Sequence, residues 1–152
     1  MDSQKTQVES ILIIDDDPDD FELVYAAVQR VNPDINVTYI QNCEDIVQYR
    51  KEHFDMVLLD INMPEHDGFY WLKAIREHGY NDLPVIMYTN SLSPANISKA
   101  YLEGANLYFA KPETFSNLIK GFEKLVNMDW SNPNTITKQY SHQGSYQTFQ
   151  VD

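Results

Sequence analysis

Residues 11–20 read ILIIDDDPDD, in which four apolar residues are followed by a run of acids around one proline. An apolar run without alternation is typical of a strand that is buried on both faces, as in a parallel sheet. Asp17 can cap a helix and Pro18 suits its first position, so a helix should follow this strand at once. Asp15 and Asp16 precede the cap, and we therefore expect them at the C-terminal end of the strand.

The same pattern of a short apolar run and an amphipathic stretch recurs along the chain. The last amphipathic stretch is the clearest, since its apolar residues between Phe115 and Val126 fall on one helical stripe. Strand and helix alternate five times, which predicts an α/β fold with a doubly wound, five-stranded parallel sheet in the order 2-1-3-4-5 and five helices. The ligand site of such a sheet lies at the C-terminal strand ends. The expected strands are residues 11–14, 35–40, 56–60, 85–89 and 106–110.

Length, charge and cysteine content limit the classes of protein that the chain can be. The 152 residues, 43% of them hydrophobic, suffice for one domain. No apolar run approaches the roughly 20 residues that cross a bilayer, and Cys43 is the one cysteine. We therefore expect a cytoplasmic protein without a membrane partner. The formal net charge of -12 would repel phosphate backbones, so we expect no nucleic-acid partner either.

Composition also sets the expected domain boundaries. We predict a folded domain over residues 9–128, between an N-terminal tail at residues 1–8 and a polar tail at residues 129–152. The C-terminal tail is rich in Ser, Gln, Asn and Thr, which favours disorder. Its stretch SYQTFQV, residues 145–151, could instead pair as an edge strand or bind a partner.

Polar residues at the ends of four predicted strands indicate a site for phosphoryl chemistry. Asp15 and Asp16 end the first strand and Asp60 ends the third, so three carboxylates should meet at one edge of the sheet. Like charges so close together raise one another's pKa, and a divalent cation with oxygen ligands, Mg²⁺ above all, relieves this. Thr89 ends the fourth strand and Lys111 stands at the end of the fifth. Asp60 could then act as the nucleophile, with a point charge from the lysine and a hydrogen bond from the threonine.

Each of these residue types also has a common structural role. A lone strand-end threonine is usually a β-former, and a lone lysine is usually solvated. The other acids of the first run, Asp17, Asp19 and Asp20, are explained by the helix macrodipole, which favours acids in the first turn. We predict structural roles for those three, whereas the convergence of the remaining groups favours a functional site.

Four segments resemble the conserved segments of the response-regulator receiver family of two-component signalling. They are ILIIDDDPDD, VLLDINMPEHDG, PVIMYTN and NLYFAKP, and they occur in the family's order and spacing over residues 9–128. The resemblance implies a flavodoxin-like fold and dependence on Mg²⁺, with Mn²⁺ as an alternative ion. It also implies transfer of a phosphoryl group from a phosphohistidine to an aspartate.

The resemblance assigns roles to the acids at the strand ends. It makes Asp60 the phospho-acceptor, and it implies that the metal is bound by Asp15, Asp16, Asp60 and the backbone carbonyl of Asn62.

Further roles fall on the fourth and fifth strands. The resemblance implies that Thr89 and Lys111 bind the phosphoryl oxygens. Thr89 and Tyr108 would form a switch, in which the hydroxyl moves toward the new phosphate and the aromatic ring, three residues before the lysine, turns inward behind it. A plain alternative for Tyr108 is an edge-strand aromatic with its hydroxyl in water. The segment Lys111–Pro112 resembles a family position with a cis peptide bond.

Three residues near the acceptor should tune the reaction. The family usually has a small residue after the switch threonine, whereas this chain has Asn90, which could restrict access to small phosphodonors. Asn62 and Ser91 stand two positions beyond Asp60 and Thr89, at sites that resemble those tuning hydrolysis of the acyl phosphate.

The leading hypothesis is a stand-alone receiver that is phosphorylated on Asp60 by a sensor histidine kinase or a histidine phosphotransfer protein. It would catalyse only its own phosphorylation and dephosphorylation. An unidentified downstream protein would bind the face made by the fourth helix, fifth strand and fifth helix, where we single out Ile97, Tyr101, Tyr108 and Lys120.

Three other functions use a similar fold or site. A dehalogenase-type phosphatase needs a second acid two residues after the nucleophile, and Asn62 occupies that position. A flavin-binding module needs a Ser/Thr/Gly-rich phosphate loop after the first strand, where the acids at residues 15–20 would repel phosphate. A receiver used as a structural module or as a phosphate shuttle between histidines stays open.

Overall fold

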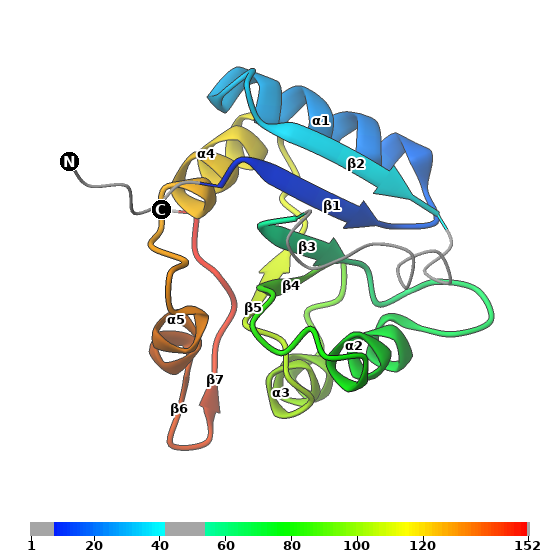
Figure 1. Cartoon of the computed structure of the whole chain (residues 1–152), viewed down its shortest axis with the longest axis vertical. Coiled ribbons are helices and arrows are strands. Elements are labelled where there is room, and N and C mark those ends of the chain that lie inside the picture. Colours follow the sequence, from blue (N-terminus) through cyan, green and yellow to red (C-terminus); the bar gives the residue numbers. More distant parts are fainter. Residues whose placement is uncertain (1–7, 42–53, 152) are drawn as a thin grey trace.

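A computed structural model describes residues 8–41 and 54–151 of the chain (Figure 1). Its main feature is a five-stranded parallel sheet in the order β2-β1-β3-β4-β5. The predicted strand order is therefore confirmed. The strands are β1 (Ser10–Ile14), β2 (Asn36–Ile40), β3 (Met56–Leu59), β4 (Val85–Thr89) and β5 (Leu107–Ala110).

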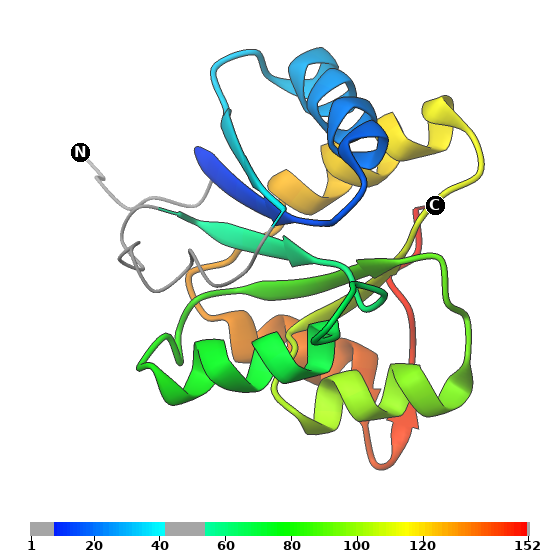
Figure 2. The same ribbon diagram turned by 90° about the vertical axis from the view of Figure 1, so that its right-hand side faces the viewer.

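Helices cover both faces of the sheet. The described helices are α1 (Pro18–Val31), α2 (Gly68–Glu77), α3 (Pro94–Leu102), α4 (Phe115–Val126) and α5 (Pro133–Tyr140). α1 and α4 lie on one face, and α2 and α3 lie on the other (Figure 2). α3 and α4 correspond to the predicted fourth and fifth helices, whereas the helix expected between β2 and β3 falls largely on residues 42–53, outside the described ranges. No described helix is both long and apolar enough to span a membrane.

The core has two halves because alternate residues of β1 face opposite sides of the sheet. Ile11 and Ile13 belong to the cluster under α1 and α4, whereas Leu12 and Ile14 belong to the cluster under α2 and α3. All four side chains are at most 1% exposed, and burial of each contributes about 2 kcal/mol to stability. Burial on both faces explains why this strand is apolar without alternation.

Side-chain caps fix where the helices begin relative to the strand ends. Asp17 accepts a hydrogen bond from the N–H of Asp19 at 2.9 Å, and Pro18 follows as the first residue of α1. Ser93 caps α3 in the same way, accepting from the N–H of Asn96 at 3.4 Å. The predicted cap of α1 is confirmed. As a consequence, the acids between β1 and α1 stay in a short loop at the edge of the sheet.

Residues 129–151, the C-terminal segment, are folded, so the prediction of a disordered tail is wrong. α5 is followed by a hairpin of β6 (Ser141–His142) and β7 (Ser145–Tyr146), after which the chain returns to β5 (Figure 1). Trp130, Ile136 and Phe149 are 9%, 4% and 4% exposed. These few apolar side chains join the main core. The prediction of disorder rested on the polar composition of the whole segment, which did not reveal them. The N–H of Phe149 donates to the carbonyl of Tyr108 at 2.7 Å, as the alternative of edge pairing anticipated.

One partly buried arginine fixes the opposite, N-terminal edge of β4 and β5. The guanidinium of Arg76 donates to the carbonyls of Tyr80, Leu83 and Gly104 at 2.6–2.7 Å and to the Oδ1 of Asn106 at 2.9 Å. Burial lowers the pKa of Arg76 to about 10, so the group stays charged at pH 7. The planar fork of arginine suits several carbonyls at once, which an ammonium group with three donors does not.

Candidate functional site

Backbone pairing places the strand-end residues at one level of the sheet. The N–H of Asp60 donates to the carbonyl of Ile14 at 3.0 Å, so Asp60 directly follows β3 beside the end of β1. The N–H of Lys111 donates to the carbonyl of Thr89 at 2.8 Å, which sets these two residues side by side after β5 and β4. The five residues that the sequence singled out, Asp15, Asp16, Asp60, Thr89 and Lys111, therefore stand at the same edge.

Three carboxylates meet at this edge. Asp15, Asp16 and Asp60 each offer an oxygen, and these atoms lie within 4.8 Å of one another. Asp15 and Asp60 are 1% and 6% exposed, whereas Asp16 faces solvent. Burial raises the pKa of Asp15 to about 6, although the N–H of Asp17 and the charge of Lys111 oppose the rise. Burial also raises the pKa of Asp60, against the opposing charge of Lys111.

The ammonium of Lys111 lies among acids. Its Nζ is 2.6 Å from the Oδ2 of Asp20, 3.1 Å from the Oδ2 of Asp15 and 3.7 Å from the Oδ2 of Asp60. Burial lowers the pKa of Lys111, but these acids outweigh it and the net change is upward. Lys111 is followed by a trans peptide bond, since the described residues contain no cis bond, so the expected cis bond before Pro112 is not present.

Asp20 is the site residue that sequence reasoning missed. We predicted a structural role for it in the first turn of α1, yet its carboxylate is the one nearest to Lys111. Side chains of a helix tilt toward its N-terminus. The third residue of α1 therefore reaches back over the end of β1, and this geometric signal could have identified it.

Thr89 and the loop after Asp60 lie close to the Asp60 carboxylate. Thr89 is fully buried, and its hydroxyl opposes the rise in the pKa of Asp60 that burial causes. The N–H of Asn62 approaches the Oδ1 of Asp60 at 3.4 Å, and the N–H of Ser91 approaches the Oγ1 of Thr89 at 3.4 Å. Asn90 is exposed. Asn62 thus contacts Asp60 and Ser91 contacts Thr89, while the influence of Asn62, Asn90 and Ser91 on a reaction rate stays a prediction.

Tyr108 points into the molecule. Its side chain is fully buried, and its hydroxyl donates to the carbonyl of Ser91 at 2.8 Å. Its N–H donates to the hydroxyl of Tyr101 at 3.1 Å, and that hydroxyl in turn donates to the carbonyl of Gln147 at 2.6 Å. The alternative of an edge aromatic with its hydroxyl in water is therefore wrong for this structure.

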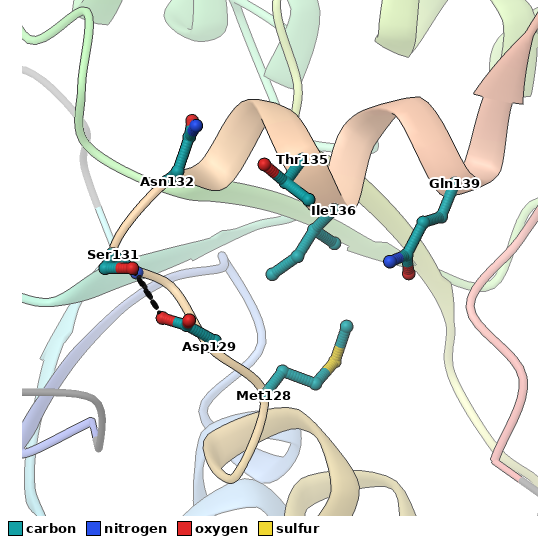
Figure 3. Close-up of a pocket in the computed structure, with 7 residues that line it drawn as sticks. All are labelled: Met128, Asp129, Ser131, Asn132, Thr135, Ile136 and Gln139. Carbon is teal, nitrogen blue, oxygen red and sulfur yellow. Dashed lines mark hydrogen bonds between the residues drawn. The ribbon is translucent and has the colours of Figure 1, made fainter.

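A separate pocket between the end of α4 and α5 shares no residue with this edge. In Figure 3 the Asp129 carboxylate is engaged by Ser131, whose N–H and hydroxyl donate to it at 3.0 and 2.6 Å. The bonds close a turn and lower the pKa of Asp129. The pocket is lined by Met128, Asp129, Ser131, Asn132, Thr135, Ile136 and Gln139. The strand-end cluster is accordingly the stronger candidate site.

Comparisons with known proteins agree with this geometry. The family model of the response regulator receiver domain matches residues 11–123. The two-component response regulator ORR26 of rice, Oryza sativa subsp. japonica, is 31% identical over 109 residues, which are 71% of this chain and 18% of that protein. The chain likewise spans less than half the length of several other curated relatives.

Solved structures support the fold. The phosphorylated cyanobacterial phytochrome response regulator RcpA superposes with a TM-score of 0.67 at 21% identity, over 77% of this chain and 90% of that one. The Mn²⁺-bound response regulator Rcp1 gives a TM-score of 0.65 at 22% identity, over 77% and 91% of the two chains. Because the family model matches most of the chain and the sheet order agrees with it, the chain belongs to the response regulator receiver domain family.

Proposed function

We propose that Asp60 accepts a phosphoryl group from a phosphohistidine of a sensor histidine kinase or a histidine phosphotransfer protein. The observation that carries this proposal is the setting of the Asp60 carboxylate, which lies 3.7 Å from the Lys111 ammonium and clusters with the carboxylates of Asp15 and Asp16. Membership of the receiver family supports the same reaction.

The reaction needs little from the protein beyond position and charge. A carboxylate oxygen of Asp60 forms the new bond to phosphorus, while the bond from phosphorus to the histidine nitrogen breaks and leaves its electron pair on that nitrogen. Lys111 offsets negative charge on the phosphoryl oxygens, and Thr89 donates a hydrogen bond to one of them.

The acids at this edge suit a divalent cation. The pKa values of two buried carboxyls stay raised despite the nearby Lys111 ammonium, so a further cation would stabilise their charged forms, and Mg²⁺ prefers oxygen ligands. Asp15, Asp16, Asp60 and the backbone carbonyl of Asn62 would hold the ion, with Mn²⁺ as an alternative, as in the similar Mn²⁺-bound Rcp1 structure. The bound ion supplies positive charge to the phosphoryl oxygens.

The state of Asp60 would be passed on by protein contact. We propose a cytoplasmic receiver that catalyses only the gain and loss of its own phosphoryl group. Its downstream partner would bind the face formed by α3, β5 and α4, which includes Ile97, Tyr101, Tyr108 and Lys120. Asn62, Asn90 and Ser91 would tune how long the phosphoryl group persists.

A labelling experiment tests the acceptor. Wild-type protein, Asp60→Asn and the control Asp19→Asn are incubated with Mg²⁺ and acetyl phosphate or a cognate kinase, and intact mass is measured. We expect one added phosphoryl group in the wild type and in Asp19→Asn, none in Asp60→Asn, and none in any sample after chelation of the metal. Equal labelling of wild type and Asp60→Asn, or no labelling of either, would overturn the proposal.

A further inference from the structure

The C-terminal segment covers the outer edge of β5. The N–H of Phe149 donates to the carbonyl of Tyr108 at 2.7 Å, and the carbonyl of Gln147 accepts from the Tyr101 hydroxyl at 2.6 Å. The ring of Tyr146 stacks on that of Tyr101 with 6.0 Å between their centroids. Residues 146–149 therefore bind both β5 and α3, and Figure 1 shows this part of the chain running past β5.

The same segment also reaches α4. The Phe149 ring meets the Phe109 ring edge-on at 5.1 Å, and the Nζ of Lys124 lies 5.1 Å from the centre of the Phe149 ring. Lys124 further donates to the carbonyl of Gln150 at 2.7 Å. Residues 146–150 thus contact all three elements of the face that we propose for the downstream partner.

A short chain of contacts joins this segment to the acceptor. The Tyr108 hydroxyl donates to the carbonyl of Ser91, and the N–H of Ser91 approaches the Thr89 hydroxyl. That hydroxyl is in turn close enough to Asp60 to lower the pKa of its carboxyl. Tyr108 contacts both the loop near the acceptor and the C-terminal segment. Its side chain contacts the loop after β4, whereas its N–H and carbonyl engage Tyr101 and Phe149.

We propose that docking of residues 146–149 on β5 and occupancy of Asp60 by a phosphoryl group are coupled through Tyr108 and favour each other. With the segment docked, the Thr89 hydroxyl already faces Asp60 and the Tyr108 ring is already buried behind it. This form needs the least rearrangement to donate a hydrogen bond to a phosphoryl oxygen, so a phosphoryl group binds it best. The inference rests on the proposed function of Asp60.

The coupling also defines the surface that a partner meets. While the segment is docked, a protein that approaches α3, β5 and α4 contacts residues 146–150 instead of the bare edge of β5. A partner that pairs directly with β5 must displace these residues. Because their docking favours a phosphoryl group on Asp60, such a partner disfavours phosphorylation.

Hydrogen exchange of the full chain tests whether occupancy of Asp60 strengthens docking of residues 146–149. The exchange rate of the Phe149 amide is measured by NMR without and with beryllofluoride and Mg²⁺, and beryllofluoride binding is followed by ¹⁹F NMR. We expect exchange to slow by about fivefold or more, the low end of common coupling between two sites. Unchanged or faster exchange with beryllofluoride bound overturns the inference but leaves the proposed function intact. Failure of beryllofluoride to bind the wild type overturns the proposed function and this inference together.

Two variants test whether weaker docking of residues 146–149 lowers the affinity of Asp60 for beryllofluoride. Tyr101→Phe removes the hydroxyl that joins Tyr108 to Gln147 but keeps the ring, and Phe149→Ala removes the buried ring. Because coupling is reciprocal, each should weaken beryllofluoride binding, whereas the control Tyr25→Phe, on exposed surface of α1, should not. Circular dichroism establishes that each variant is folded. If Phe149→Ala unfolds, Tyr101→Phe decides alone, and unchanged affinity in that variant contradicts the coupling.

Discussion

At Asp15, burial outweighs two favourable contacts. Its Oδ1 accepts from the N–H of Asp17 at 2.9 Å and its Oδ2 lies 3.1 Å from the Nζ of Lys111, yet the pKa still rises to about 6. The folded protein therefore prefers a neutral group at this position when no metal is bound. A site that is poised for a cation is, for the same reason, a local cost to the fold.

The first prediction concerns stability and pH. Between pH 3.8 and about 6, the folded protein binds a proton at Asp15 that the unfolded chain releases, so its contribution to the free energy of unfolding falls as pH rises. The loss amounts to about 3 kcal/mol above this window. Asp15→Asn should raise the free energy of unfolding at pH 7 by about 1–3 kcal/mol without metal, as measured by urea denaturation. The exposed control Asp34→Asn should change it little, and a less stable Asp15→Asn would contradict the argument.

A second prediction concerns the partner of Lys111. Its ammonium is nearer to Asp20, at 2.6 Å, than to Asp60, at 3.7 Å, so the Asp20 carboxylate competes with an incoming phosphoryl group. Asp20→Asn should tighten beryllofluoride binding by roughly fivefold, corresponding to about 1 kcal/mol. Asp19→Asn makes the same charge change in the first turn of α1 and serves as the control. Weaker binding to Asp20→Asn would show that Asp20 supports Lys111 instead.

At the scale of elements, α2 begins against the backbone of Asp60 and Ile61. The N–H of Gly68 donates to the carbonyl of Ile61 at 2.8 Å. A Cβ atom at Gly68 would lie 2.3 Å from the carbonyl oxygen of Asp60. Only glycine allows the helix to start this close, so the position of Asp60 depends on the first residue of α2.

The third prediction follows from this close approach. Gly68→Ala should lower the free energy of unfolding by about 1–3 kcal/mol, because backbone rather than a flexible side chain must move. It should also weaken beryllofluoride binding, because the moved backbone belongs to Asp60. Urea denaturation and a ¹⁹F titration measure the two effects, with Lys73→Ala on the exposed side of α2 as the control. Unchanged beryllofluoride affinity in Gly68→Ala would contradict the prediction that the start of α2 fixes the position of Asp60.

The sequence predicts some elements well because one physical cause dominates them. β1, β3 and β4 are buried on both faces, so their residues must be apolar without interruption, and strand order then brings Asp15, Asp60 and Thr89 to one edge. The C-terminal segment has no such dominant cause. Its apolar residues have no regular spacing, and each is buried by residues distant in the sequence. The contact of Asp20 with Lys111 is likewise tertiary, and local pattern alone favoured a structural role for Asp20.

At the scale of the whole molecule, the first part of the C-terminal segment, residues 130–136, shares the main core. Trp130 and Ile136 belong to the same cluster as Phe109 and Phe122. A segment with its own core could unfold separately. Side chains that are part of the main core instead become exposed when that core unfolds.

The fourth prediction is therefore cooperative unfolding. Trp71→Phe leaves Trp130 as the only tryptophan of the chain, so fluorescence then reports on the C-terminal segment. We expect its urea midpoint to coincide with that of far-ultraviolet circular dichroism. A Trp130 transition at clearly lower urea would mean that the segment detaches before the sheet unfolds.

The contacts of Arg76 have a consequence for how the molecule can move. They hold the carbonyl of Gly104, just beyond the C-terminus of α3, together with the segments that lead into β4 and β5. The other end of α3 follows the loop of Ser91, which contacts Thr89 and Tyr108. One end of this helix is thus anchored, and the other adjoins the loop that takes part in the proposed coupling. A displacement of the Ser91 loop would consequently swing α3 about its anchored end, and its largest excursion would fall on the first turn, at Pro94.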